Sequence, residues 1–588
     1  MSLKDRFSEE LRYLRELGGD FAHDNPQLAQ FLGQDSSDPD VERLLEGFAF
    51  LTAKLRLKLE DDLPELTHTM LQMLWPNYLR PLPSATIIQF SPHRQALSQA
   101  HTVPKGSRLF SKPVDGIACE FRTCTDVVLH PFILDEVTAT QATGSSSVSL
   151  NLTSLAQRPL DSLGCDSLEF HLSGEDRCAQ TLYLWLSQYL THVDVVLDGQ
   201  VRRLPANSVR FSGFDTDEAL LPYPQNVFDG YRILQEYFVF PQRFHFFRLT
   251  NLGQVWPACE SQQVRIEYHF DRQLPSTLRI GLGDFSLFCT PAVNLFKHGA
   301  EPIDLSGHAA QVTLTPSGRQ PHAYEIFSVD QVISTRTTAD GHAGDPLREF
   351  RPFESFAHEI EHAQGRTALY YRCKVEDSLR GDGLVHRIAF VRADESNYIG
   401  ALETTSIDLT CTNRDLPLAL GIGDISVDTE VTPPLASYRN ICRPTRPYRP
   451  VLDGQLHWSL ISNLSLNYLS LLSVEPLKAV LGAYDFAALH DIQRARATRK
   501  RLDGISEAHT EPLDWLIKGL PIRGLRTRLK LDQNAFLCEG DLYLFGCVLS
   551  QFFALYASIN SFHRLEVLNT TNNELYTWPL LTGRQPLI

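Results

Sequence analysis

The 588-residue sequence has no long apolar run, no C-x-x-C cysteine pair and no surplus of basic residues. A membrane-spanning helix needs roughly 20 apolar residues and a signal peptide needs an apolar core, so we expect neither membrane insertion nor secretion. Lys and Arg number 54 against 70 Asp and Glu, and the resulting charge of −16 disfavours nucleic-acid binding. The eleven cysteines contain no C-x-x-C pair, which favours reduced thiols in the cytoplasm.

The sequence does contain enough apolar residues for several buried cores. Hydrophobic residues make up 43% and aromatic residues 10% of the chain, which excludes global disorder. The hydrophobic spacing changes from helical to strand-like near position 85, and the last third is mixed. We therefore predict an α+β protein with a helical N-terminal segment at 1–84, a β-rich middle region of two subdomains at 85–335 and a mixed α+β region at 336–588.

Three amphipathic helices are predicted in the N-terminal segment. Asp38-Pro39 is typical of a helix start, Pro64 predicts the next start, and Trp75-Pro76 predicts its end. The first stripe runs from Leu3 to Phe21, and the second includes Val41, Leu44, Leu45 and Phe48. These stripes pack either within the chain or on another subunit. We predict a subunit interface formed by Leu3, Phe7, Leu11, Leu14, Leu17, Phe21, Phe48, Leu51 and Leu55.

Further elements are predicted from local composition. Strands are expected at 85–90, 132–134, 181–186 and 192–199, because these runs are rich in β-branched and aromatic residues. Residues 138–149 and 337–346 are rich in Thr, Ser, Ala, Gly or Asp and predict loops. Helical spacing predicts helices at 230–240, before Pro241, and at 542–559.

One short motif is typical of zinc hydrolases. His358-Glu359-Ile360-Glu361-His362 matches H-E-x-x-H, in which two helical histidines bind Zn²⁺ and Glu359 acts as general base. Ala368 stands where a third histidine would be expected, and a polar helical turn explains the same residues. Phosphate-binding and nucleophile-elbow motifs are absent from the sequence. We therefore predict no enzyme, no catalytic or cofactor-binding residues, no cofactor and no metal site, with a zinc hydrolase at His358 and His362 as the alternative.

Glu236 stands among aromatic residues in the sequence, so we expect its carboxylate to be buried. A buried carboxylate can serve as a catalytic acid, but a satisfied structural hydrogen bond is the favoured interpretation.

The chain resembles the TssF (VasA/ImpG) family of type VI secretion baseplate subunits, and the similarity extends nearly end to end. It is carried by ordered blocks at residues 10–17 (ELRYLREL), 38–53 (DPDVERLLEGFAFLTA), 230–238 (GYRILQEYF), 290–296 (TPAVNLF), 411–417 (CTNRDLP) and 552–562 (FFALYASINSF). The H-E-x-x-H stretch lies between these blocks.

The resemblance implies a structural wedge component of a contractile, phage-tail-like injection machine. Two copies of such a subunit are expected to embrace one TssG-like subunit, with TssK-like trimers at the periphery and a TssE-like subunit nearby. Six wedges would surround a VgrG hub and support assembly of tail tube and sheath. The resemblance also implies a cytoplasmic location, with the baseplate docked at the inner-membrane complex.

Overall fold

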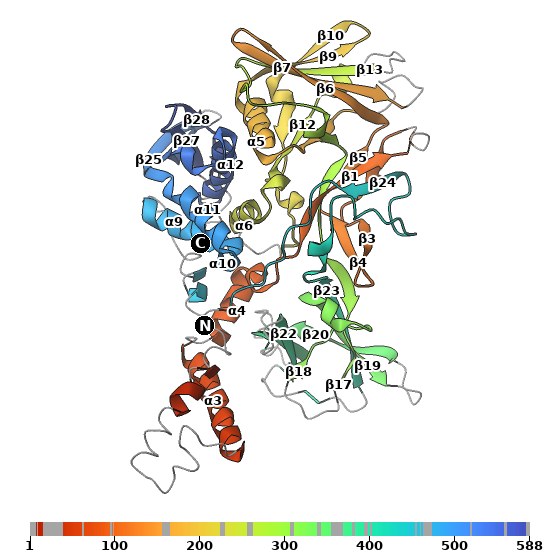
Figure 1. Ribbon diagram of the computed structural model, residues 1–588, viewed down its shortest axis with the longest axis vertical. Coiled ribbons are helices and arrows are strands. Elements are labelled where there is room, and N and C mark those ends of the chain that lie inside the picture. The colour runs from red at the N-terminus through yellow and green to blue at the C-terminus, as the bar shows by residue number, and fades with distance from the viewer. Residues whose placement is uncertain are drawn as a thin grey trace.

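The computed structural model contains an extended helical arm and a body built from several sheets (Figure 1). The described residues are 7–8, 10–15, 39–60, 64–93, 97, 99–155, 165–223, 230–255, 263–305, 311–337, 343–353, 369–378, 383–392, 398–399, 403–452, 456–458, 460–461, 473–517, 520–557 and 561–583. Helices and antiparallel sheets are both abundant, so the predicted α+β class is confirmed. Among the described residues, no helix combines the length and apolar character needed to cross a membrane.

The arm is formed by helices whose starts were predicted from proline. Helix α3 (Pro39–Glu60) and helix α4 (Pro64–Leu74) both begin at proline, which lacks the backbone N–H that the first helical turn leaves unpaired. Helix α4 ends before Trp75-Pro76, and Pro76 starts the short 3-10 helix η2 (Pro76–Leu79). These boundaries confirm the second and third predicted helices, and α3 lies at the end of the molecule that is lowest in Figure 1.

A central antiparallel sheet joins segments that are far apart in the sequence. Its order is β24 (Ala436–Asn440), β1 (Ala85–Pro92), β15 (Cys289–Val293), β4 (Ile117–Thr123) and β3 (Arg108–Val114). Within it, Ile88 pairs with Thr290 on one side and with Asn440 on the other. Strands from both sides of position 335 therefore share this sheet, while the three-part domain division remains a prediction.

A second antiparallel sheet, here called the distal sheet, lies at the end of the molecule opposite α3 (Figure 1). Its order is β10 (Gln200–Pro205), β9 (Leu190–Leu197), β13 (Gln263–Phe270), β7 (Ser145–Ser154) and β6 (Phe132–Ala142). The loop predicted at 138–149 is wrong, because β6 and β7 form a hairpin that turns at Gly144, where φ is +78°. Glycine adopts this left-handed conformation without strain, so polar strands can pair around it.

A four-stranded sheet and a buried helix lie beside the distal sheet. The sheet contains β11 (Val209–Phe211), β12 (Phe246–Leu249), β8 (Leu168–Leu172) and β14 (Phe285–Leu287). The strand predicted at 181–186 is wrong: these residues belong to helix α5 (Asp176–Leu184) and the π-helical turn η4 (Trp185–Tyr189). Residues 181–186 are all buried, so an apolar run that resembles a central strand is here a helix enclosed on most sides.

The largest sheet has eight strands. They are β16 (Phe296–Gly299), β23 (Glu403–Thr412), β19 (Glu325–Thr337), β20 (Ala343–Pro352), β21 (Leu369–Asp377), β22 (Leu384–Arg392) and β18 (Val312–Thr313), with β17 (Ile303–Asp304) paired to β23. Strands β19 and β20 extend into the loop predicted at 337–346, since Thr335 pairs with Pro346. A separate pair joins β2 (His101–Val103) to β5 (Val127–Leu129).

The C-terminal part combines a sheet with helices. Strands β25 (Ile505–Ile517), β26 (Leu520–Leu531), β27 (Phe562–Asn569), β28 (Leu575–Thr577) and β29 (Leu581–Thr582) accompany helices α9 (Val474–Ala483), α10 (Phe486–His490), α11 (Ile492–Asp503) and α12 (Glu539–Tyr556). Helix α12 confirms the helix predicted at 542–559. It packs on α5 so closely that a Cβ at Gly540 would meet the backbone oxygen of Gln180 at 2.0 Å.

Candidate interaction surface

Helix α3 presents an uncovered apolar stripe, here called the α3 apolar face, which consists of Leu44, Phe48 and Leu51. Their spacings of four and three residues place them on one side of the helix. Their exposed fractions are 73%, 64% and 59%, respectively. Isolated exposed apolar residues are ordinary, but three on one helical face form a patch typical of a binding surface.

The adjacent side of α3 packs within the chain. Ala49 is fully buried, and Val41 and Leu45 are half-buried. The rim of the helix is polar, and the ion pair between Arg43 and Asp40, at 3.9 Å, is almost entirely exposed. Such a pair contributes little to stability, because water and salt screen it. An apolar centre with a charged rim is the usual composition of a protein interface.

The N-terminal helical residues are less exposed than α3. Phe7, Leu11 and Leu14 are half-buried, Glu10 is 8% exposed and Tyr13 is 57% exposed. This first stripe therefore already contacts the chain in part. Three predicted interface residues, and the side chain of a fourth, lie outside the described residues: Leu3, Leu17, Phe21 and Leu55.

The structure places only part of the predicted interface on an open surface. Phe48 and Leu51 lie together on the α3 apolar face, as the spacing requires. Leu44 belongs to the same face; sequence analysis placed it in the second stripe, four residues before Phe48, but did not select it for the predicted interface.

The arm is fixed to the body by a cluster of aromatic rings around Trp75. The Trp75 ring centroid lies 5.4 Å from Tyr78, 5.7 Å from Tyr231 and 5.3 Å from Tyr484. Phe486, the first residue of α10, lies 6.0 Å away. Trp75, Tyr78, Tyr231 and Tyr484 are at most 1% exposed, and rings at these separations attract beyond their burial. Trp75 thus anchors the arm to helices α6 (Gly230–Val239) and α10.

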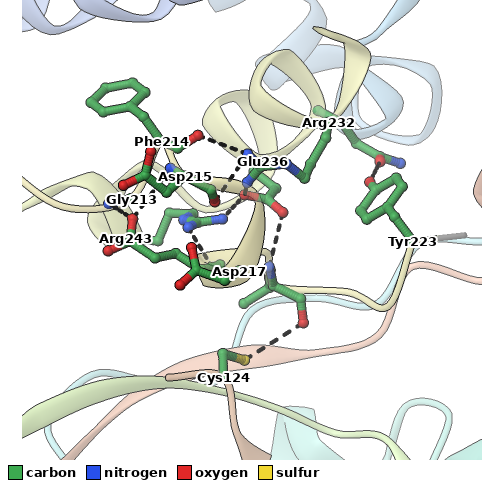
Figure 2. A network of polar contacts seen from close by, with 12 residues as sticks. Cys124, Gly213, Phe214, Asp215, Asp217, Tyr223, Arg232, Glu236 and Arg243 are labelled. Carbon is green, nitrogen blue, oxygen red and sulfur yellow. Dashed lines mark hydrogen bonds and ion pairs between the residues drawn. The ribbon is translucent and has the colours of Figure 1, made fainter. Parts of the chain in front are cut away.

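A buried ionic cluster stabilises the body beside this anchor (Figure 2). Glu236 of α6 pairs with Arg232, one helical turn earlier, at 3.4 Å, and with Arg243 of η7 (Pro241–Phe244). Its other oxygen accepts a hydrogen bond from the Leu220 backbone N–H at 3.0 Å. All three charged residues are at most 3% exposed. The predicted burial of Glu236 is therefore confirmed.

The donors of the two arginines are directed at the neighbouring loop. Arg232 Nη2 donates to the carbonyl oxygens of Phe214 and Asp215 at 2.9 and 3.2 Å, and Arg243 Nη2 donates to that of Glu218 at 2.7 Å. Burial, with a smaller contribution from Arg232, lowers the pKa of Arg243 to about 9. These contacts fix the loop at 213–221 to α6. The Glu236 carboxylate is thus hydrogen-bonded and ion-paired within the fold, which confirms the favoured interpretation of a satisfied structural group.

The H-E-x-x-H motif at 358–362 lies outside the described residues. The structure therefore does not test the alternative interpretation of this motif as a zinc site.

The chain is similar to known proteins along its whole length. The family described as "Type VI secretion system, TssF" matches residues 1–585. The type VI secretion system component TssF1 of Pseudomonas aeruginosa is 32% identical over 99% of both chains. A chain of a solved TssK-TssF-TssG baseplate subcomplex is 30% identical, with a TM-score of 0.76 over 92% of this chain and 99% of that one. A chain from a solved type VI baseplate complex is 28% identical, with a TM-score of 0.68 and full coverage of both. The chain therefore belongs to the TssF family of type VI secretion baseplate components.

Proposed function

We propose that this chain acts as a structural wedge subunit that organises the baseplate by protein contacts and catalyses no reaction. The main support is its likeness, over 92% of its length, to a chain solved in a TssK-TssF-TssG baseplate subcomplex. The α3 apolar face adds support, because a helix with an uncovered apolar stripe is suited to helix packing between subunits.

The proposed occupant of the α3 apolar face is a TssG-like subunit. Burying Leu44, Phe48 and Leu51 from their present exposure would contribute a gross free energy of about 3 to 6 kcal/mol. Ordering and association costs reduce this gain, so the face would supply part of a larger interface. The half-buried residues Leu11 and Leu14 would extend it toward the N-terminus.

The other expected partners belong to the same proposal. A TssK-like subunit is supported by the composition of the solved subcomplex. Contacts with a second copy of this chain, a TssE-like subunit and a VgrG hub follow from the family resemblance. The same resemblance is the basis for placing the assembled baseplate in the cytoplasm, docked at the inner-membrane complex.

Co-purification with a TssG-like subunit tests the role of the α3 apolar face. Phe48→Asp should abolish co-purification, because an unpaired carboxylate would be buried, while the melting temperature of the isolated chain should stay unchanged. Ile422→Asp is a matched control, since Ile422 is also 64% exposed but lies in a turn of the body. The control should co-purify normally. Undiminished capture by the Phe48 variant would contradict the proposal.

A further inference from the structure

Four metal-binding side chains meet on one face of the distal sheet. His192 and Asp194 alternate along β9, and Glu267 and His269 alternate along β13. In the antiparallel register, His192 lies opposite His269 and Asp194 lies opposite Glu267. Side chains two residues apart share a face, so the four form a block across two strands. The intervening Val193, Val195, Ile266 and Tyr268 are buried on the other face.

The ligand atoms lie at distances that suit a single cation, and the stacked His192 and His269 rings, with centroids 4.6 Å apart and planes at 15°, would have to turn toward the ion to bind it. Asp194 Oδ2 lies 3.6 Å from His192 Nε2 and 3.5 Å from His269 Nε2. Ligand atoms of these three residues all lie within 4.8 Å of one another. Tetrahedral zinc with bonds of roughly 2.0 to 2.1 Å requires ligand atoms about 3.3 Å apart, close to the observed separations. Glu267 Oε2, 3.5 Å from His269 Nε2, is a further carboxylate oxygen beside the cluster.

A hydrogen-bonded threonine sets the tautomer of one histidine. Thr191 Oγ1 donates to the backbone oxygen of His269 at 2.9 Å, so its oxygen can only accept from His192 Nδ1, also at 2.9 Å. In the neutral ring, the His192 Nε2 lone pair then faces the Asp194 carboxylate. Orientation of a ligating histidine through its second nitrogen is characteristic of metal sites.

The surroundings of His269 and of the Asp194 and Glu267 carboxylates also suit a cation. His269 Nε2 is buried and accepts or donates no hydrogen bond among the described residues. Arg203 holds Asp194 through Nε to Oδ1 at 2.9 Å and Nη2 to Oδ2 at 3.1 Å, and Arg265 Nε lies 2.7 Å from Glu267 Oε1. Both arginine side chains are more than half exposed, and their contacts orient the carboxylates. A neutral imidazole nitrogen facing a carboxylate oxygen is repelled by it, and a positive charge between the two, from a proton or a metal ion, removes that repulsion.

We propose that His192, Asp194 and His269 bind one Zn²⁺ ion, with Glu267 beside the fourth position. Two imidazole nitrogens with carboxylate oxygen form a donor set that suits zinc. Arg203 and Arg265 offset the carboxylate charge, so the site is weaker than a thiolate site. All donors come from paired strands, and the ion would lock β9 to β13. Sequence analysis predicted no metal, and its only zinc alternative lay elsewhere, at His358 and His362.

Zinc titration of the full chain, after treatment with a chelator, tests the site by calorimetry and by the visible spectrum of Co²⁺ as a substitute ion. We expect one equivalent of zinc and the intense bands of tetrahedral Co²⁺. His192→Asn with His269→Asn should weaken binding by more than 100-fold and abolish the bands. The matched control is His358→Asn with His362→Asn, which removes the same number of histidines and should bind as the wild type does.

Thr191→Val provides a second test that leaves every ligand in place. We expect it to weaken zinc binding by about 10- to 100-fold, as losses of outer contacts to a ligand do. If the double histidine variant unfolds, this variant and the wild-type stoichiometry still decide the question. Absence of stoichiometric binding to the wild type would overturn the proposal, as would loss of binding in the His358 and His362 variant alone.

Discussion

Replacing Glu236 by glutamine should strongly destabilise the region around α6. The amide keeps the size of the side chain and can still accept the hydrogen bond from Leu220 N–H, but it removes the negative charge that pairs with both Arg232 and Arg243. Both guanidinium groups are at most 2% exposed, so water cannot replace the lost charge. Removing one partner of a buried ionic cluster costs about 3 to 5 kcal/mol.

Hydrogen exchange measured by mass spectrometry is suited to this test, because it reports the opening free energy of individual segments in a large chain. A loss of 3 to 5 kcal/mol corresponds to exchange about 100- to several thousand-fold faster in peptides covering residues 230–244. The matched control is Glu169→Gln, since Glu169 pairs with Arg248 at 3.0 Å but both side chains are partly exposed. The control should cost less than about 1 kcal/mol. Equal effects of the two variants would refute the reasoning from burial.

Two further predictions concern the N-terminal stripe and acid sensitivity. Leu14→Asp should abolish binding to a TssG-like subunit in pull-down while the isolated chain keeps its melting behaviour; a large fall in melting temperature with normal binding would defeat this prediction. Burial lowers the pKa of His171 to about 3 and that of His245 to about 4, so both stay neutral in the folded state. Below pH 6.5 the unfolded state takes up protons while both histidines of the folded state stay neutral. The free energy of unfolding should therefore fall by about 2 kcal/mol per histidine between pH 6.5 and pH 5. Denaturant unfolding at pH 6.5 and at pH 5 should show a smaller loss of unfolding free energy in His245→Asn than in the wild type. An identical loss would contradict the contribution assigned to His245.

Proline made the helical boundaries of the arm predictable. Pro39 and Pro64 begin helices in the structure, and Trp75-Pro76 ends one, because proline fixes φ and its ring restricts the residue before it. Local sequence patterns also predicted the helix at 230–240 and the strand at 192–199, and the structure confirms both. Features decided within a few residues of the chain could therefore be inferred from the sequence.

Features that depend on neighbours were missed. Residues 181–186 form a nearly continuous apolar run, so their spacing could not distinguish a buried strand from a buried helix. In the structure this segment is helical and packs closely on α12. The polar residues at 138–149 form strands because the distal sheet supplies pairing partners. Tertiary context outweighed local preference in both cases.

The candidate site was predictable only in part for the same reason. Helical spacing placed Phe48 and Leu51 in one stripe, and both side chains are exposed in the structure, while their role in an interface remains a prediction. His192 and His269 are far apart in the sequence, and only the register of β9 against β13 places them opposite each other. A shift of one residue would turn one of them into the core, and no local signal fixes that register.

The pairing of β1 in the central sheet has a consequence for synthesis of the chain. Ile88 pairs with Asn440, and these residues are 440 − 88 = 352 positions apart. At 5 to 20 residues per second, a ribosome needs about 20 to 70 s to add the segment between them. Throughout that interval, β1 lacks the strand that covers one of its edges, and an open edge can pair with other chains. The order of translation thus leaves β1 in need of a chaperone or an early partner until β24 has been made.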